Sequence, residues 1–393
     1  MSEQETVSTM TGKSTTAGWR IASAPHVTQG RQKTRSAPRA VDLFSGCGGL
    51  SEGLSQAGFR VIGAVEIHPL AVETYKANHP GVEVWSTDIK ALQVSSVMKK
   101  LKLCKGQLDL LAGCPPCQGF SRIRTLNGSS PVDDERNELI THFLRFVRGM
   151  LPRFVMMENV PGLAADQRFK TLCNALKRLG YVVNWSILNA RDYGVPQRRK
   201  RLMLLAGLRQ NVPFASRDAK MHTVREAFAR LPAVGESGDP PHDVTENRSE
   251  RIKKLIASVP HNGGSRTDLP SSRQLECHKR CDGFKDVYGR MAWDDVAPTI
   301  TGGCFNPSKG RFLHPEEDRA ITMREAAILQ SFGRDYVFPN CRNKAAIALL
   351  IGNALPPEFV RRHAVQVLNL LEACAGAAKA PKSPGASQGN NAG

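Results

Sequence analysis

The stretch VDLFSGCGGLSEG, residues 41–53, is the part of the chain that decides the fold. An apolar run leads directly into Gly46, Gly48 and Gly49, and a helix is predicted to follow at Leu50–Ala57. Glycines at this place let the backbone turn sharply and approach a ligand closely. The sequence therefore predicts a strand, a tight turn and a helix, with a ligand site at the turn.

The same alternation of short apolar runs and helix-length segments extends outward from this stretch. Strands are predicted at Ala40–Phe44, Val61–Glu66, Glu83–Ser86, Leu108–Ala112, Phe154–Glu158, Val182–Leu188 and Leu202–Ala206. Helices are predicted between them, including Leu50–Ala57, Leu70–Asn78, Leu139–Met150 and Phe169–Leu179. This rhythm predicts an α/β fold with a mostly parallel sheet and helices on both of its faces.

The rhythm breaks at about residue 209, where Pro, Gly and charged residues become frequent. Helical patterns return at Met323–Gln330, Ala345–Ile351 and Phe359–Leu371. We predict a first domain at 39–208, completed by 343–374, and a smaller irregular domain at 209–342. Residues 1–38 form a basic tail without periodicity, and 375–393 are similar in composition, so both are predicted to be disordered.

The charge balance favours a polyanionic partner. The chain of 393 residues has a net charge of +18 and a pI of about 9.7. Residues 1–40 contribute six basic and two acidic side chains, a net +4, which fits either a solvated arm or a nucleic-acid contact. The remaining +14 lies beyond this tail, and it is the stronger indication, because Lys and Arg release counterions from a phosphate backbone.

The composition also excludes several classes of protein. No run of 18 apolar residues occurs, so no membrane-spanning helix is expected, and residues 1–20 lack the apolar core of a signal peptide. The ten cysteines are scattered and are predicted to be reduced, mostly buried thiols. We predict a soluble cytoplasmic protein that associates with the nucleoid through DNA, and a monomer with no obligate protein partner.

Acidic residues follow the second and third predicted strands. Glu66 ends a strand 20 residues after Gly46, which suits a carboxylate that binds ribose hydroxyls, and Asp88 follows the next strand. A dinucleotide fingerprint would need a third glycine where Ser51 stands, and Glu52 would repel a pyrophosphate in the first helical turn. A ligand with an adenosine and no phosphates, such as S-adenosylmethionine, fits better.

Cys117 is presented by a rigid turn after the fourth predicted strand, in LDLLAGCPPCQGFSR. Two prolines precede it and restrict the backbone, so the thiol suits a nucleophile at the edge of the sheet. Two other interpretations stay open. The Cys114-x-x-Cys117 spacing resembles a redox pair, and the two thiols together with Cys277, His278 and Cys281 resemble a zinc site.

Polar residues follow two further predicted strands. Glu158 and Asn159 end the apolar run RFVMMEN, where a helix cap or a turn is the plain alternative to a functional role. In QRRKR, the side chains of Gln197, Arg199 and Arg201 alternate and so lie on one face of an extended segment. Because this charged run leads into a strand that reads as buried, it is more than a solvated surface.

Taken together, these runs resemble the motifs of DNA cytosine-5 methyltransferases of the bacterial type. The resemblance covers about residues 39–373 and rests on DLFSGCGGLSEG, PPCQGFSR, ENV, QRRKR, REAAILQSF and GNALPP in this order. It implies the Rossmann-like fold of S-adenosylmethionine-dependent methyltransferases, with residues 209 to about 300 as the target-recognition region. One departure is SFGRDY after Phe332, where relatives often have a proline and acids.

The resemblance also implies roles at the cofactor end. Phe44 would lie against S-adenosylmethionine, and Gly46 and Gly48 would make room for it. Glu66 would hold the ribose and Ile67 would pack on the adenine. Asp88 with Ile89 would read the adenine edge, and Asn353 would close the pocket from a helix late in the chain.

At the catalytic end, the resemblance implies that Cys117 is the nucleophile and that Glu158 binds the N3 and amino edge of cytosine. Arg199 and Arg201 would bind the substrate, and residues 118–137 would form a loop that closes over double-stranded DNA. The chemistry requires such groups. A thiolate that adds to C6 makes C5 nucleophilic, and negative charge then builds at N3, where a proton or a donor has to stand ready.

Three other functions remain to be compared with this prediction. A tRNA cytosine-5 methyltransferase would use the same pocket on RNA, although PPCQGFSR resembles the DNA type. A catalytically silent DNA-binding regulator would not need Cys117 and Glu158. A dinucleotide oxidoreductase is disfavoured by Ser51 and Glu52.

Overall fold

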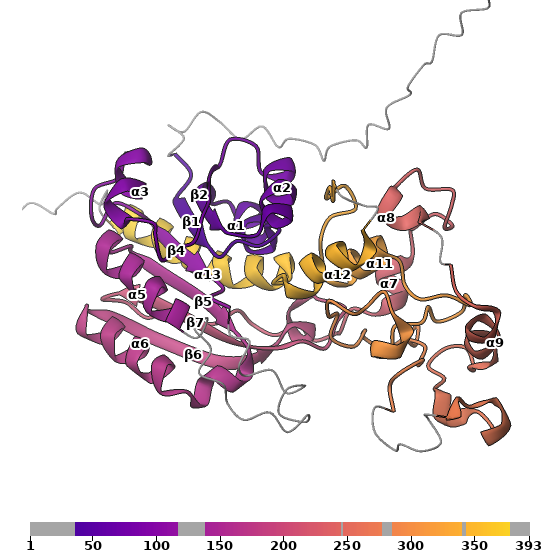
Figure 1. Cartoon of the computed structure of the whole chain (residues 1–393). Helices are drawn as coiled ribbons and strands as arrows, with labels where there is room; N and C mark the ends of the chain where they lie inside the picture. Colours follow the sequence, from indigo (N-terminus) through magenta and orange to yellow (C-terminus); the bar gives the residue numbers. More distant parts are fainter. Residues whose placement is uncertain (1–35, 117–137, 245–246, 277–284, 340–342, 378–393) are drawn as a thin grey trace, which may run out of the picture. The chain divides into compact units, whose positions relative to one another are not determined.

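The structure is a computed structural model that describes residues 36–116, 138–244, 247–276, 285–339 and 343–377. Residues 39–208 contain a seven-stranded sheet (Figure 1). The strand order is β3-β2-β1-β4-β5-β7-β6. The strands are β1 (Arg39–Leu43), β2 (Arg60–Glu66), β3 (Glu83–Ser86), β4 (Leu110–Gly113), β5 (Phe154–Asn159), β6 (Tyr181–Asn189) and β7 (Lys200–Leu208).

The sheet is mostly parallel, as predicted. Strands β1 to β5 pair in parallel, and β7 runs antiparallel to both β5 and β6. Strand β1 lies between β2 and β4, so the strand order reverses there. Ligands of open α/β sheets bind at the carboxyl ends of the strands next to such a reversal.

Helices cover both faces of the sheet, and β1 shows why. Val41 and Leu43 point into the apolar core beneath one layer of helices, and Ala40 points into the core beneath the other, because side chains alternate along a strand. The first layer consists of α3 (Val94–Lys100), α5 (Leu139–Met150) and α6 (Gln167–Arg178). The second layer includes α1 (Gly49–Ala57) and α13 (Pro357–Ala377).

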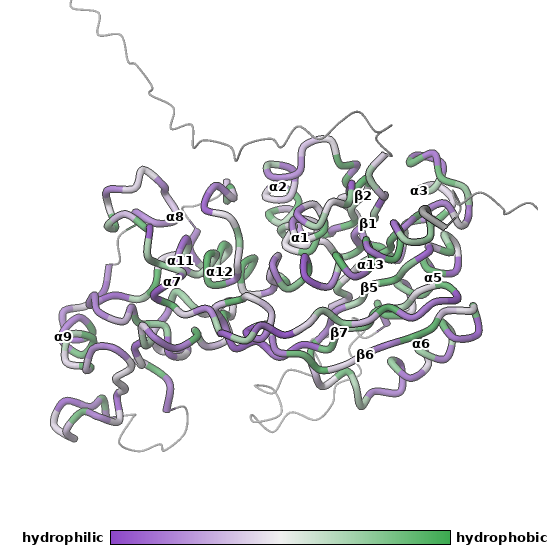
Figure 2. The backbone as a smooth tube through the Cα atoms, turned by 180° about the vertical axis from the view of Figure 1, so that it is seen from behind, coloured by the Kyte–Doolittle hydropathy of each residue, from purple (hydrophilic) through white to green (hydrophobic). Residues whose placement is uncertain are grey.

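The second half of the chain has short elements between long irregular segments. Its helices are α7 (Val224–Phe228), α8 (Pro240–Asp243), α9 (Glu250–Ser258), α11 (Met323–Leu329) and α12 (Lys344–Asn353). A separate apolar cluster packs α7, α11 and α12 together, and a smaller one lies beneath α9. The backbone is mainly hydrophobic along the strands of the sheet and mainly hydrophilic around α9 (Figure 2).

The predicted strands and helices agree with the structure to within two residues at most ends. Helices α3, α7, α8 and α9 were not among the predicted elements. Helix α2 (Pro69–Asn78) begins with a proline at its first turn, where no N–H is needed. The predicted tail at 375–393 is wrong at its start, because α13 continues to Ala377. The rest of that tail and residues 1–35 lie outside the described residues.

The predicted domains at 39–208, 209–342 and 343–374 remain predictions. Packing shows where the chain rejoins the sheet. Ile347 and Ile351 of α12 belong to the cluster with α11, whereas Leu355 and the residues of α13 pack beneath the sheet. Within the described part of the chain, no helix is long and apolar enough to cross a membrane.

Candidate active site

The carboxyl edge of the sheet collects the side chains that the sequence singled out. Glu66 is the last residue of β2, and Glu158 is the next to last of β5. Gly46 follows β1 closely, and Cys114 directly follows β4. Because β7 runs antiparallel, its beginning with Arg201 lies at this same edge. Residues from five strands are thus brought to one edge.

Glu66 holds the glycine turn after β1. Its Oε2 accepts a hydrogen bond from the Gly46 N–H at 2.8 Å. Its Oε1 accepts hydrogen bonds from the N–H groups of Ile67 at 3.0 Å and His68 at 2.8 Å. A carboxylate can accept about four hydrogen bonds. Since Glu66 is only partly buried, it keeps acceptor capacity for a ligand.

The turn itself has an unusual backbone. Phe44 has a φ of 62°, in the left-handed region that a bulky residue rarely adopts, and its ring packs against the apolar core. Strain of this kind is typical of ligand-binding positions. Gly46 has a φ of 56°, and no atom lies within 4 Å of the position where its Cβ would be. The turn therefore leaves open space beside Glu66.

The neighbouring side chains divide into exposed and buried ones. Ile67 is 62% exposed, an unusual place for a large apolar side chain, directly beside the Glu66 carboxylate. Asp88 is partly buried, and its Oδ1 accepts a hydrogen bond from the Lys90 N–H at 2.8 Å. Ile89 is 3% exposed and belongs to the core, so its side chain is not at the edge. Only its backbone is left for a contact with adenine.

Gly48 makes room for two protein side chains, and its contact with S-adenosylmethionine stays a prediction. A Cβ there would lie 2.5 Å from the Tyr336 hydroxyl and 2.6 Å from His79 Nε2. The Tyr336 hydroxyl donates a hydrogen bond to the Cys47 carbonyl and lies 3.2 Å from His79 Nε2. Burial lowers the pKa of His79 to about 4, so its ring is neutral. Tyr336, in the segment after α11, thus fixes the glycine turn through its hydrogen bond to Cys47.

A buried carboxyl lies beneath this turn. Ser51 Oγ donates a hydrogen bond to Asp42 Oδ2 at 2.7 Å and is 2.8 Å from the Tyr75 hydroxyl. The other oxygen of Asp42, Oδ1, is buried without a partner in the described structure. Burial raises the pKa of Asp42 to about 7, opposed by the Ser51 hydrogen bond and assisted by the Glu66 charge. Ser51, where a dinucleotide fingerprint needs glycine, serves this contact.

At the other end of the edge, Glu158 and Arg201 form an ion pair. Arg201 Nε lies 2.8 Å from Glu158 Oε1, and both side chains are largely buried. Strand register explains the contact: Glu158 is opposite Met203, and Arg201 is two residues from Met203 on the same face. The pair holds two charged groups with hydrogen-bonding capacity at fixed positions.

The loop that leads to Cys117 is held by Asn159. Its Nδ2 donates a hydrogen bond to the Pro115 carbonyl at 2.9 Å, and the bond is buried. Cys117 itself and residues 118–137 lie outside the described residues. Burial raises the pKa of the Cys114 thiol well above its usual value, and the nearby Glu158 charge adds to the shift. A thiol held in its protonated form is a poor nucleophile.

Arg199 and Gln197 hold the backbone together. Arg199 is 2% exposed, and its Nη1 donates to the Ile300 carbonyl at 3.0 Å, while Nη2 donates to the carbonyls of Gly352 and Ala354 at 2.9 and 3.0 Å. The Gln197 amide bonds to Leu329, Gln330 and Ile300. The expected alternation along this segment is present, but the three side chains have different partners. A substrate contact by Arg199 stays a prediction, with both of its terminal nitrogens engaged by the protein.

Asn353 lies at the end of α12, and its side chain is exposed. The carbonyls on either side of it, those of Gly352 and Ala354, bind Arg199. The backbone at Asn353 is therefore fixed while its amide is accessible.

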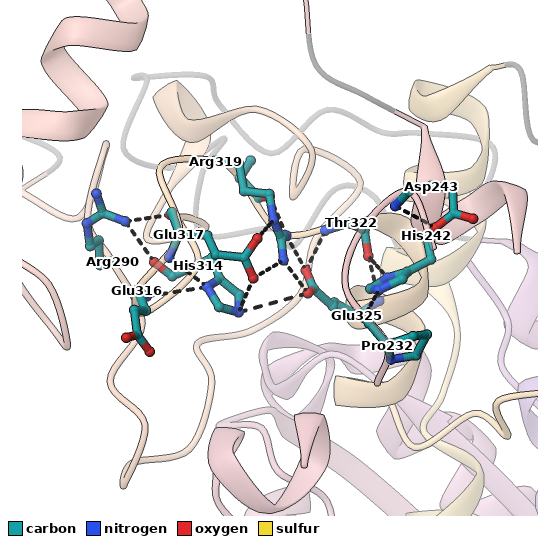
Figure 3. Close-up of polar contacts among 12 residues, drawn as sticks. Pro232, His242, Asp243, Arg290, His314, Glu316, Glu317, Arg319, Thr322 and Glu325 are labelled. Atoms are coloured by element: carbon teal, nitrogen blue, oxygen red, sulfur yellow. Dashed lines mark hydrogen bonds and ion pairs between the residues drawn. The ribbon is translucent and has the colours of Figure 1, made fainter. Parts of the chain in front are cut away.

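Beyond the sheet, a chain of charged side chains crosses the second half of the molecule (Figure 3). Arg319 binds Glu317 and Glu325 through both ends of its guanidinium. The ring Nδ1 of His314 accepts hydrogen bonds from the N–H groups of residues 316 and 317. Burial lowers the pKa of His314. No group of three or more metal-ligating side chains occurs among the described residues, and the thiols at 117, 277 and 281 lie outside them.

Comparison with known proteins identifies the family. Residues 39–369 match the family of C-5 cytosine-specific DNA methylases. The chain belongs to this family. It is therefore an enzyme, a DNA cytosine methyltransferase, and the recognition of its motifs in the sequence is confirmed.

Curated relatives cover most of this methylase. The Type II methylase M.HgiDII of Herpetosiphon aurantiacus is 35% identical over 349 residues, which span 84% of this chain and 95% of the relative. The Type II methyltransferase M1.HphI of Haemophilus parahaemolyticus is 34% identical over 339 residues, spanning 84% and 86%.

Solved structures agree with this assignment. The methylase is similar to a protein encoded within an E. coli prophage and solved as a candidate DNA modification methyltransferase, with a TM-score of 0.65 and 25% identity over 86% of this chain and all of the other. The methyltransferase EhMeth of Entamoeba histolytica has the same fold, with a TM-score of 0.58 and 15% identity over 86% of this chain and 99% of the other. The predicted methyltransferase fold is confirmed.

Some residues at the edge of this methylase were missed from the sequence. Tyr336 and His79 contact the glycine turn from positions 257 residues apart, and no local pattern announces such a contact. Asp42 reads as part of an apolar strand, although a carboxyl inside an otherwise apolar run is itself a signal. The role of Asn159 could have been suspected from its place beside Glu158.

Proposed function

We propose that this methylase transfers a methyl group from S-adenosylmethionine to C5 of a flipped cytosine in a specific sequence of double-stranded DNA, through a covalent bond between Cys117 and C6. The Glu158–Arg201 pair, at 2.8 Å, is the observation that carries this proposal. It stands beside the Pro115 carbonyl that Asn159 holds, two residues before Cys117. The acid and the cation thus stand at the sheet edge to which the chain leads just before Cys117.

The residues around the glycine turn fit S-adenosylmethionine. Glu66 would accept hydrogen bonds from ribose hydroxyls with the capacity that its backbone bonds leave free. The exposed Ile67 would pack on the adenine, and Asp88 would accept a hydrogen bond from its amino group. The space beside Gly46 and the strained Phe44 would receive the rest of the molecule, with Asn353 closing the pocket. When bound, S-adenosylmethionine supplies a methyl group on a positive sulfur, open to attack by a carbon nucleophile.

The protein's part in the chemistry is to make C5 of cytosine nucleophilic. The Cys117 thiolate forms a bond to C6, and the electrons of the C5–C6 double bond shift toward C4 and N3. Glu158 would meet the charge at N3 by sharing or delivering a proton, and Arg201 would donate to O2. C5 then takes the methyl group as the bond between that methyl and the cofactor's sulfur breaks, with both electrons left on sulfur. The proton shared at N3 would return to Glu158 as the ring regains its aromatic form. A base removes the proton from C5, the C5–C6 double bond re-forms, and Cys117 leaves as thiolate.

The two arginines of QRRKR would divide the work. Arg201 lies against Glu158 and would contact the base directly. Arg199 binds three carbonyls of the segments at 300 and 352–354, so it would position the base site and Asn353 rather than touch cytosine.

The cytosine has to leave the helix for this reaction. Sulfur adds to the ring from one face and the methyl group arrives at C5, and neither approach is open within a base stack. We assign the recognition of the target to residues 209–342. Because the relatives M.HgiDII and M1.HphI are Type II methylases, we also propose a role in a restriction-modification system. Exchanging residues 209–290 with a relative is expected to change the methylated sequence and to preserve the chemistry.

The decisive experiment traps the covalent bond. A duplex carrying 5-fluorocytosine at the target offers no C5 proton to remove, so the adduct formed after methyl transfer cannot break down. Wild-type protein with S-adenosylmethionine should form a complex with this DNA that survives denaturing electrophoresis. Cys117→Ser should form none and transfer no methyl group, and a fully active Cys117→Ser protein would exclude the mechanism.

The matched control is Cys114→Ser, three residues away. The partly buried Cys114 thiol has no role in this scheme, so the variant should keep most of its activity and still trap the fluorinated duplex. A dead Cys114→Ser protein would instead favour the redox or zinc interpretation. Methyl incorporation is also measured with tRNA and with duplex DNA as substrates. Incorporation into tRNA and not into DNA would favour the tRNA methyltransferase.

A further inference from the structure

A groove of about 620 Å³ lies in the second half of the molecule, away from the sheet edge. One wall is α9 and the other is the segment around η6 (Ser271–Arg273). Three cations and one carboxylate line it: Arg251 and Lys254 on α9, and Arg273 and Glu276 on the opposite wall, so the charge of the lining is net positive. All three cations are exposed. The groove has no part in the chemistry proposed above.

The two cations on α9 share one face of the helix. Residues three apart are neighbours on a helix surface, so Arg251 and Lys254 stand side by side, and their like charges repel each other. Lys253, which lies between them in the sequence, forms an ion pair with Glu250 at 2.9 Å and does not line the groove. The helix thus neutralises one of its cations and leaves two beside each other.

Neither these two cations nor Arg273 has a side-chain hydrogen bond or an ion pair with any residue that the structure describes. In contrast, all three guanidinium nitrogens of the buried Arg290, which binds carbonyls at the end of α9, donate hydrogen bonds. A concentration of unpaired positive charge on two facing walls costs free energy in the isolated protein. An anionic ligand would recover it.

The groove is built on a rigid base. Leu255 and Ile256 of α9 pack with Leu269 and Leu313 in a small apolar cluster. Arg290, which is fully buried, donates hydrogen bonds to the carbonyls of Ile256 and Val259 at the end of α9, both at 3.0 Å. The same guanidinium bonds to the carbonyls of residues 314 and 317, where the charged chain of Figure 3 begins. The cations of α9 are therefore held in a fixed position.

We propose that this groove binds the phosphate backbone of duplex DNA and so positions the DNA on the target-recognition region. The inference rests on the proposed function, in which residues 209–342 meet the DNA. Among the residues that the structure describes, no aromatic side chain lines the groove, which disfavours single strands held by base stacking. Flexible Lys and Arg side chains without a fixed hydrogen-bond frame suit phosphates, which carry no sequence information.

The test removes the charge on the groove and compares it with equal removal elsewhere. The variant Arg251→Gln, Lys254→Gln, Arg273→Gln is matched by Arg60→Gln, Lys99→Gln, Arg178→Gln, which neutralises two exposed arginines and one exposed lysine on β2, α3 and α6. Binding to fluorescent duplexes with and without the target sequence is measured from about 50 to 300 mM salt, which includes the range of about 50 to 200 mM over which about 6–10 phosphate contacts lose about 10³–10⁵ in affinity.

The groove variant is expected to bind both duplexes at least ~10-fold more weakly at low salt, with a salt slope smaller by about 2–3, since each phosphate contact contributes about 0.9. The KM for DNA should rise, and kcat at saturating DNA and the methylated sequence should not change. Restoring charge with Arg251→Lys and Arg273→Lys should restore the slope.

Affinity and slope equal to those of the matched variant would overturn the proposal. Weakening confined to the target duplex would also overturn it, because it would mean contact with bases. These outcomes are distinguishable from failure of the proposed function. If the proposed function itself were wrong, the wild-type protein would show no methyl incorporation and no trapped adduct in the same preparations.

Discussion

The sheet edge and the region from 209 to 342 use charged side chains in opposite ways. At the edge, Glu66 and Glu158 are tied by few bonds and keep capacity for a ligand. In the second region, buried and partly buried arginine side chains donate their hydrogen bonds to backbone carbonyls of the protein itself. Arg290 binds four carbonyls, and Arg311 binds those of residues 263, 264 and 290. The edge keeps part of its hydrogen-bonding capacity free for a ligand, and the second region uses much of its charge as scaffold.

This contrast has a physical cause. Buried carbonyls have to be hydrogen-bonded, and a region with little regular structure cannot supply partners from strand or helix ladders. An arginine has five N–H donors on a rigid plane and can satisfy several carbonyls at once. Part of the net +18 is therefore structural, and only the unpaired remainder, such as the cations of the α9 groove, is free for DNA. Net charge alone overstated the surface available to a polyanion.

The largest effect that would sharpen the contrast is expected at Glu158. Glu158→Gln should lower the rate of tritium exchange at cytosine C5, which needs thiolate attack but no methyl transfer, by ~10²–10³, or about 3–4 kcal/mol. The amide keeps a hydrogen bond but cannot deliver a proton. DNA affinity should barely move, because phosphate contacts elsewhere hold the duplex. Wild-type exchange rates in this variant would place the charge-stabilising group elsewhere.

Arg290→Lys tests the scaffold half of the comparison. A lysine keeps the charge but has three donors, so it cannot serve four carbonyls and the Asp318 carboxylate together. We expect the free energy of unfolding in urea to fall by about 3 kcal/mol, as for other disrupted buried charges. Arg60→Lys, at an exposed position, should change it by less than about 0.5 kcal/mol. Equal stability of the two variants would refute the scaffold role.

Asp42→Asn tests whether the charged form of the buried Asp42 carboxyl lowers the free energy of unfolding. The raised pKa of about 7, against 3.8, means that the folded state holds the proton. The stability from this group is fully present below pH 3.8 and is lost as the pH rises through 7. Asparagine does not titrate. Relative to wild type, the variant should therefore gain about 2–3 kcal/mol between pH 5 and pH 8, given about 1.4 kcal/mol per pKa unit.

Urea unfolding of both proteins at each pH measures this difference, and all other titrations cancel in the comparison. A stability difference that stays constant from pH 5 to pH 8 would mean that the folded state tolerates the Asp42 charge. In that case, ionisation of the buried Asp42 carboxyl does not lower the free energy of unfolding.

The smallest expected effect lies where the two regions meet. Tyr336→Phe removes the hydrogen bond to the Cys47 carbonyl and should loosen the glycine turn. We expect the KM for S-adenosylmethionine to rise about fivefold, or about 1 kcal/mol, with kcat unchanged. Tyr181→Phe is the matched control, because it also loses a buried hydrogen bond to a carbonyl, that of Pro152, away from the turn. Equal KM values in the two variants would show that Tyr336 contributes only stability.

Local patterns predicted the parts of the molecule whose contacts are local. Every predicted strand is present, because strand and helix periods depend on neighbours in the sequence. The placement of Glu66 and Glu158 at one edge followed from parallel strands. The different partners of the two arginines could not be predicted, because both occupy equivalent positions in QRRKR. Arg201 pairs with Glu158, whereas Arg199 binds backbone carbonyls. Their partners at 158, 300 and 352–354 depend on the return of the chain.

The sequence by itself determined the α/β sheet, the family and the edge at which the chemistry is expected. These depend on short motifs and on periodicity, which persist whatever the rest of the chain does. Only the tertiary structure decided which cations are free. Arg290 and Arg251 are the same residue type in the same region, yet one is buried against four carbonyls and the other lines an open groove. That distinction arises from burial and from partners distant in sequence, because a guanidinium binds whatever acceptor the folded chain places beside it.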